Sequence, residues 1–236
     1  TAANGSVHQI YPIRSTDTIS RLKDAFSSIP ALYIADGHHR CKSAVNVVHR
    51  RRDRGQDVPE ETYHVMGVIF AEDEVKVHGY SRLLTTLGDY SPASFLQALR
   101  SVATVTPFDE VDPAAYAITP HTMSRDLHVF HLYLQGSWYE CAIQVSSTAS
   151  QIDSLDVSVL QDQILVPFLG ITDSRGDPRL QYLGGARPIR DLMARVDSGE
   201  YVAAIAMQPV DVQTVCSIAD EGGIMPPKST WFEPKL

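Results

Sequence analysis

Hydrophobic positions along the chain follow the helical spacing in some segments and form short continuous runs in others. Ile19, Leu22 and Phe26 share one face at helical spacing, which predicts an amphipathic helix. The same pattern predicts helices over 39–54, 153–168, 188–196 and 210–219, and Ser91-Pro92 is typical of a helix start. Apolar runs predict strands over 31–35, 63–70, 75–78, 102–108, 127–134, 138–145, 180–183 and 201–207.

This mixture of elements predicts an α/β fold of the mixed α+β kind, with a mixed sheet flanked by helices. The strands over 127–134 and 138–145 flank Gln135-Gly136-Ser137, which indicates a β-hairpin. We expect a first region over 1–90, built around a strand, a turn and a helix. A second α+β region over 91–236 closes over it in this prediction, with a C-terminal strap at 221–236.

Composition and charge narrow the function classes. Hydrophobic residues make up 44% of the 236 residues and the net charge is -8, which is typical of a globular protein and disfavours nucleic acid as a partner. No apolar run reaches the length of a membrane span, and no signal-peptide pattern stands at the start. Cys41, Cys141 and Cys216 are scattered, which favours reduced thiols in a cytoplasmic protein over disulfides or a zinc site.

The strongest chemical signal is the turn Asp36-Gly37-His38-His39-Arg40, placed between a predicted strand and a predicted helix. The first N–H groups of a helix have no internal partners and lie at the positive end of its dipole. Gly37 permits close approach of a phosphate, Arg40 can hold two phosphate oxygens, and His38 and His39 add donors. Asp36 can cap the helix, place Mg²⁺ or orient a histidine. A plain Asp-Gly helix start with surface histidines explains the same residues equally well.

A second candidate group lies elsewhere in the chain. Lys228, Ser229 and Thr230 stand in a proline-framed loop and can supply a further phosphate contact, or simply belong to a solvated strap. Tyr80 and Arg82 are two residues apart in a predicted strand and so face the same side, where they line a pocket, or Tyr80 simply covers the core with its hydroxyl in water.

Several ordered blocks resemble the family known as domain-of-unknown-function family 1015. The first is Ile34-Ala35-Asp36-Gly37-His38-His39-Arg40. The others are Val77–Leu83, Ile164–Ile171, Leu180–Gly185 and Met225–Leu236. Members of that family carry a long portion ahead of the Asp-Gly-His-His-Arg box, whereas 35 residues precede Asp36 here. The resemblance therefore implies that an N-terminal segment of the same protein is missing from this chain.

The first block is also similar to the phosphate-binding turn of the ParB/sulfiredoxin-like superfamily, which includes nucleotide-dependent free-serine kinases. This resemblance implies a nucleotide-binding domain of small-molecule phosphotransferase type, with ATP or ADP and Mg²⁺ as cofactors. Asp36, His38 and His39 would then be catalytic, with Asp36 as the metal ligand. Gly37, Arg40, Tyr80, Arg82, Lys228, Ser229 and Thr230 would bind the nucleotide.

Two departures from that superfamily keep other functions open. No acidic residue matches the base of the serine kinases, and His38 stands where sulfiredoxin has its reactive cysteine. The alternative is a non-catalytic nucleotide-sensing module that keeps the turn without the chemistry. A DNA-binding adaptor is disfavoured by the acidic balance.

Overall fold

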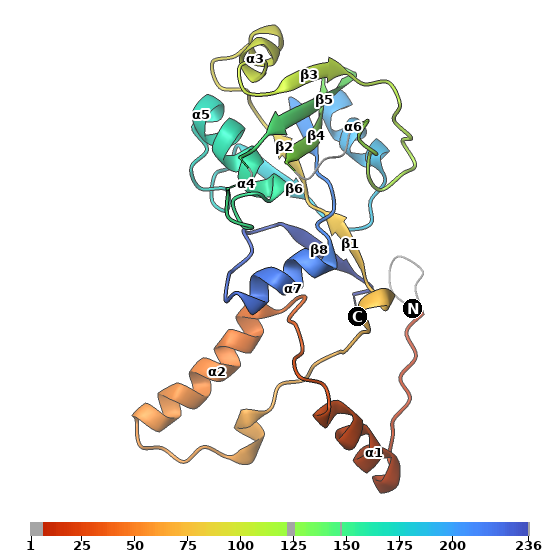
Figure 1. Cartoon of the computed structure of the whole chain (residues 1–236), viewed down its shortest axis with the longest axis vertical. Helices are drawn as coiled ribbons and strands as arrows, with labels where there is room; N and C mark the ends of the chain where they lie inside the picture. Colours follow the sequence, from red (N-terminus) through yellow and green to blue (C-terminus); the bar gives the residue numbers. More distant parts are fainter. Residues whose placement is uncertain (1–6, 122–125, 147, 236) are drawn as a thin grey trace. The chain divides into compact units, whose positions relative to one another are not determined.

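The chain forms two compact units in this computed structural model, which describes residues 7–121, 126–146 and 148–235 (Figure 1). Unit 1 holds residues 1–70 and 234–236, and unit 2 holds 71–233. The division differs from the boundary expected near residue 90, because the strands over 76–84 pair within unit 2. Residues 1–6 and 236, which the expected first region and strap include, lie outside the described residues.

Unit 2 is built on a six-stranded sheet with the order β3-β5-β4-β7-β2-β6. These strands are Thr104–Pro107, Ser137–Gln144, Leu127–Leu134, Ala203–Ala206, Ser81–Leu84 and Leu180–Leu183. The expected hairpin is confirmed, since β4 and β5 pair from Leu127↔Gln144 to Leu134↔Ser137. Every pairing in the sheets is antiparallel, in place of the mixed sheet expected. The mixed α+β class itself is confirmed.

Side chains that alternate along the central strands build a core on each face of this sheet. Leu132 and Leu134 of β4 belong to one buried cluster, and Tyr133 between them belongs to the other. The first cluster is closed by α3 (Pro92–Leu99), α4 (Asp156–Leu160) and α5 (Val166–Leu169), and the second by α6 (Ile189–Asp197). The sheet therefore lies between two layers of helices.

The remaining elements of unit 2 follow the sequence pattern with one irregularity. The helix expected over 153–168 contains a π-helical segment, Gln161–Leu165, between α4 and α5, and it ends at Gly170 with φ 61°. The helix expected near the C-terminus is α7 (Val212–Asp220). A separate two-stranded ladder joins β1 (Lys76–Gly79) to β8 (Thr230–Glu233), so part of the expected strap is a strand. Among the described residues, no helix has the length and apolar character needed to cross a membrane.

Unit 1 contains two helices and little else that is regular. They are α1 (Thr16–Ser27) and α2 (His38–Asp53), and both confirm the helices predicted from hydrophobic spacing. Ser15 caps α1 by accepting a hydrogen bond from the Thr18 amide at 3.3 Å. A short 3-10 turn, Glu60–Tyr63, follows α2.

The strands predicted over 31–35 and 63–70 are wrong. Apart from the 3-10 turn, both segments are irregular, and none of their residues is buried. A strand is stable only when a neighbour takes up its backbone hydrogen bonds, and neither segment pairs with a strand of the described chain. Leu32 and Ile34 therefore stay 60% and 47% exposed, although their sequence is that of a buried strand.

Candidate anion-binding site

Helix α2 starts at Gly37 without any capping side chain. Gly37 is the N-cap residue with φ 88° and ψ 20°, a left-handed conformation that side chains other than hydrogen rarely permit. Its own amide donates to Asp36 Oδ1 at 2.8 Å, and its carbonyl accepts the first helical hydrogen bond from the Cys41 amide at 3.0 Å. Asp36 therefore binds the backbone before the helix and does not cap α2. The residues Asp36–Arg40 are called the Gly37 turn below.

Three amide groups of the Gly37 turn remain available. The amides of His38, His39 and Arg40 come before the Cys41 amide, which makes the first hydrogen bond of the helix. None of the three has a hydrogen-bond acceptor within the described ranges of the chain. Such groups carry the positive end of the helix dipole and need an acceptor from water or a ligand. The uncapped start of α2 is therefore suited to negatively charged oxygen atoms.

The Arg40 guanidinium lies over the same backbone. A Cβ atom added to Gly37 would be 3.0 Å from Arg40 Nη2 and 3.3 Å from Nε, so the side chain folds back onto the turn. Arg40 is exposed to solvent, and no ion pair within the described residues holds its guanidinium. It therefore adds a full positive charge beside the three amides.

Lys235 brings a second cation to the turn. Its Nζ lies 3.2 Å from Asp36 Oδ2, and both residues belong to unit 1. Partial burial raises the pKa of Asp36, but the Gly37 amide and the charges of Lys235 and Arg40 lower it below its ordinary value. Asp36 is therefore ionised at neutral pH. Sequence reasoning missed Lys235, although it belongs to the C-terminal block quoted for the family resemblance.

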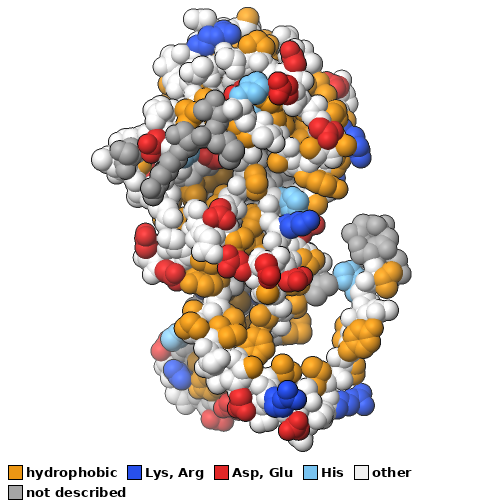
Figure 2. Space-filling view, turned by 45° about the vertical axis from the view of Figure 1, so that its right-hand side comes forward, with side chains coloured by type: hydrophobic (Ala, Val, Ile, Leu, Met, Phe, Trp, Pro, Cys, Tyr) orange, Lys and Arg blue, Asp and Glu red, His pale blue; other side chains and the backbone are white. Residues whose placement is uncertain are grey.

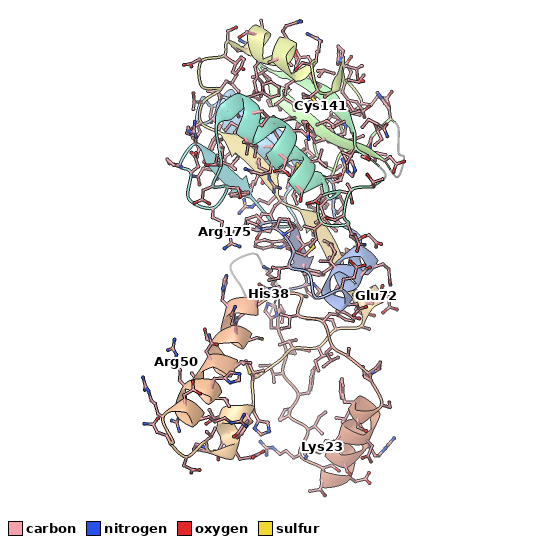
Figure 3. All side chains as sticks on the ribbon, turned by 60° about the vertical axis from the view of Figure 1, so that its left-hand side comes forward. Lys23, His38, Arg50, Glu72, Cys141 and Arg175 are labelled. Carbon is pink, nitrogen blue, oxygen red and sulfur yellow. The ribbon has the colours of Figure 1, made fainter. Side chains whose placement is uncertain are left out.

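The expected catalytic histidines, His38 and His39, are exposed at the start of α2. Figure 3 shows His38 at the start of this helix and Arg50 toward its other end. Neither His38 nor His39 contacts Asp36 or another acidic side chain in the part of the chain that the structure describes. Their catalytic roles, and the orientation of a histidine by Asp36, stay predictions.

The residues of the Gly37 turn fit an anion better than a metal ion. Among the described residues, no group of three histidine, cysteine or acidic side chains is arranged to hold a metal. Asp36 is the one carboxylate of the turn, and it already accepts an amide and pairs with Lys235. Mg²⁺ at Asp36 therefore stays a prediction without support from a second protein ligand.

Three residues of the second candidate group come together in unit 2. Lys228 Nζ lies 5.1 Å from the centre of the Tyr80 ring, and Arg82 Nη2 donates to the Lys228 carbonyl at 3.2 Å. Ser229 is buried, and its hydroxyl donates to the Pro226 carbonyl at 2.7 Å, so this donor is already used. Thr230 begins β8. A role for these residues in nucleotide binding stays a prediction.

Comparison with known proteins gives a family and several weaker likenesses. No curated protein matches the sequence. A conserved hypothetical protein from Pyrococcus furiosus is similar at 16% identity and a TM-score of 0.44, over 89% of this chain and 74% of that one. A free serine kinase in complex with AMP is similar at 16% identity and a TM-score of 0.43, over 94% and 81%.

A mutant free serine kinase in complex with ADP is similar at 15% identity and a TM-score of 0.40, over 94% of this chain and 82% of that one. At these TM-scores, none of the likenesses establishes a shared fold or activity. The family match is firmer, because the model described as "Protein of unknown function (DUF1015)" covers residues 1–158. Since these residues make up more than half of the chain, the protein belongs to the DUF1015 family.

Proposed function

We propose that unit 1 binds the phosphate groups of a nucleotide at the Gly37 turn, as part of a small-molecule phosphotransferase. The observation that carries the proposal is the uncapped start of α2, where three amides have no acceptor among the described residues and the Arg40 guanidinium lies against Gly37. The resemblance of this block to a phosphate-binding turn supports the same assignment.

The chemistry of phosphoryl transfer needs such an arrangement of charge. The transferred group spreads negative charge over its oxygens, and a site accelerates the reaction mainly by positioning and electrostatic stabilisation. In the proposal, the amides of His38, His39 and Arg40 bind phosphate oxygens directly, and the guanidinium holds two oxygens at once. The Lys235 ammonium, 3.2 Å from Asp36, adds positive potential to the turn.

Calorimetric titration with ATP, ADP and inorganic phosphate tests the binding, with and without Mg²⁺. We expect Arg40→Gln to weaken nucleotide binding at least tenfold, because a charge-assisted bidentate contact is lost. Arg50→Gln is the matched control, since Arg50 is an exposed arginine in the last turn of the same helix. Equal affinities for the wild type and Arg40→Gln would remove the proposal.

A nucleotide-sensing module without catalysis is the second candidate function. It is favoured by one observation, namely that no acidic side chain orients His38 or His39 among the described residues. This candidate predicts nucleotide binding without turnover. A phosphorylation assay against free serine and a panel of small hydroxyl compounds separates it from the phosphotransferase, because only the latter yields a phosphorylated product.

A further inference from the structure

Arg82 is a buried cation that no carboxylate pairs with among the described residues. Its side chain stands on β2 in unit 2 and is 4% exposed. The guanidinium donates to the main-chain carbonyls of Tyr80 and Lys228, and it lies 5.3 Å from the centre of the Tyr182 ring. No carboxylate of the described chain lies within ion-pair distance of it. Arginines buried to this degree are normally paired with an acid.

The charge of Arg82 is kept at neutral pH in spite of its burial. Burial lowers the pKa of Arg82 to about 10, which leaves the guanidinium protonated. A guanidinium has five N–H donors, and the two carbonyls of Tyr80 and Lys228 take up two of them. The other donors have no acceptor within the described residues, so a ligand oxygen would complete their hydrogen bonding.

A small cavity of unit 2 has Arg82 in its wall. Its volume is about 140 Å³, and the rest of its lining is Val157, Ser158, Gln161, Asp162, Leu165, Ser174, Tyr182, Pro226 and Pro227. A cavity of roughly 150 Å³ accepts a molecule of the size of benzene. The space therefore suits a ligand of about six non-hydrogen atoms, with a polar end and an aliphatic part.

Two hydrogen bonds hold side chains in the wall of this Arg82 cavity. The Tyr182 hydroxyl donates to the Ser174 carbonyl at 2.6 Å, and Gln161 Nε2 donates to the Ile171 carbonyl at 2.7 Å. Gln161 also begins the π-helical segment, a local irregularity that is frequent at functional sites. A cavity held in this way is largely formed before a ligand enters.

We propose that the Arg82 cavity binds a small monocarboxylic acid, with its carboxylate on the Arg82 guanidinium and its aliphatic part against Val157 and Leu165. The charges of the lining favour a monoanion. Asp162 is the other charged side chain of the wall, and its carboxylate repels a second negative group on the ligand. Dicarboxylates and phosphate are therefore bound more weakly. The inference concerns unit 2 alone and goes beyond the nucleotide site proposed for unit 1.

Ligand-observed NMR titration of the full chain tests the inference with butyrate, succinate and inorganic phosphate. We expect butyrate to bind at least tenfold more tightly than the two dianions. Asp162→Asn removes an exposed carboxylate. It should reduce the ratio of butyrate affinity to succinate affinity by at least threefold. Butyrate binding that equals the binding of succinate in the wild type would overturn the assignment.

Two further variants connect the binding to the cavity. Arg82→Gln should weaken butyrate at least tenfold, and Arg190→Gln, at an exposed arginine of α6, should leave it unchanged. Because Arg82→Gln can disturb folding, Ser174→Phe provides a second approach, since it fills the half-buried edge of the cavity and keeps the carbonyl that Tyr182 needs. Butyrate that still binds a folded Ser174→Phe protein would exclude this cavity. Nucleotide binding at the Gly37 turn is measured in the Ser174→Phe and Asp162→Asn samples, which change no residue predicted to bind the nucleotide, and is expected to be unaffected.

Discussion

Unit 2 has a packed interior, whereas the described residues of unit 1 form none. All of the buried hydrophobic side chains belong to unit 2, and no residue from 7 to 70 is buried. Outside unit 1, the exposed large hydrophobic side chains are Tyr116, Val166, Val202 and Ile224, and the rest lie in unit 1. Figure 2 shows hydrophobic side chains on the surface of unit 1.

The difference shows where the stability and the candidate chemistry of this chain reside. Burial of apolar surface is the main force of folding, so unit 2 supplies most of the free energy of unfolding. The helices of unit 1 rely on local interactions such as the Ser15 cap. The amides of His38, His39 and Arg40 in this lightly packed unit have no acceptor among the described residues, and an anion bound there would stabilise the unit through mass action.

The largest effect on stability is expected when a buried ring of unit 2 is removed, and the matched variant removes an exposed side chain of unit 1. Phe130→Ala should lower the free energy of unfolding by about 3–5 kcal/mol, because Phe130 is 2% exposed and a cavity remains. Ile34→Ser should change it by less than about 0.5 kcal/mol, since Ile34 is 47% exposed. Urea unfolding followed by circular dichroism and by the fluorescence of Trp138 and Trp231 measures both. Equal losses of unfolding free energy in the two variants would show that unit 1 has a packed core.

The second prediction concerns the pH dependence of stability and a buried histidine of unit 2. His131 is fully buried, 3.3 Å from Glu140, and burial lowers the pKa of His131 to about 4 against the attraction of that carboxylate. The unfolded chain binds a proton at its ordinary pKa of 6.5, so the folded state loses stability as the pH falls from 6.5 toward 4.

Unfolding curves at a series of pH values measure this effect. His131→Gln should flatten the dependence between pH 6.5 and 4, because the titrating group is gone. His64→Gln is the control, since His64 is an exposed histidine of unit 1 and should leave the slope as it is. A wild-type stability that stays constant over this range would contradict the burial argument.

The sequence predicted unit 2 better than unit 1, and the reason is physical. Hydrophobic spacing predicts a strand correctly where a partner is present, as for the hairpin over 127–134 and 138–145. The segments 31–35 and 63–70 carry an equally apolar pattern but have no partner within the described chain, so they stay irregular. Local sequence records what a segment prefers, whereas pairing depends on the rest of the fold.

The candidate site shows the same division. The helix start at Gly37 was predictable, because a glycine turn before an amphipathic helix has a local signature. The ion pair between Asp36 and Lys235 was not, since it joins positions far apart in the sequence. The strand spacing offered a pocket beside Arg82, but the burial of Arg82 was missed, because it depends on segments far away in the sequence.

Removal of two serine helix caps, one in each unit, should have effects of intermediate size on the free energy of unfolding. Ser91 caps α3 in unit 2 by accepting from the Ser94 amide at 3.2 Å, and Ser15 caps α1 in unit 1 by accepting from the Thr18 amide. Ser91→Ala should lower the global free energy of unfolding by about 1 kcal/mol, because α3 belongs to the core. Ser15→Ala should leave the global value unchanged and speed amide hydrogen exchange in α1 alone. A global loss from Ser15→Ala would mean that unit 1 unfolds together with unit 2.

The smallest effect is expected at the ion pair of the Gly37 turn. Lys235→Ala should change the free energy of unfolding very little, because the Asp36 carboxylate is 60% exposed. It should raise the pKa of Asp36 toward its ordinary value, since one of the charges that lower that pKa is removed. Nucleotide affinity should fall by about two- to fivefold, the factor that corresponds to an exposed charge contact of under 1 kcal/mol.

NMR titration of the Asp36 carboxyl carbon and calorimetry with ADP measure the two changes. Lys23→Ala, at an exposed lysine of α1 labelled in Figure 3, is the control for the loss of one positive charge from unit 1. If Lys23→Ala weakens ADP as much as Lys235→Ala does, the effect comes from net charge and not from the turn. If Lys235→Ala alone weakens ADP binding, the cation beside Asp36 contributes to anion binding directly.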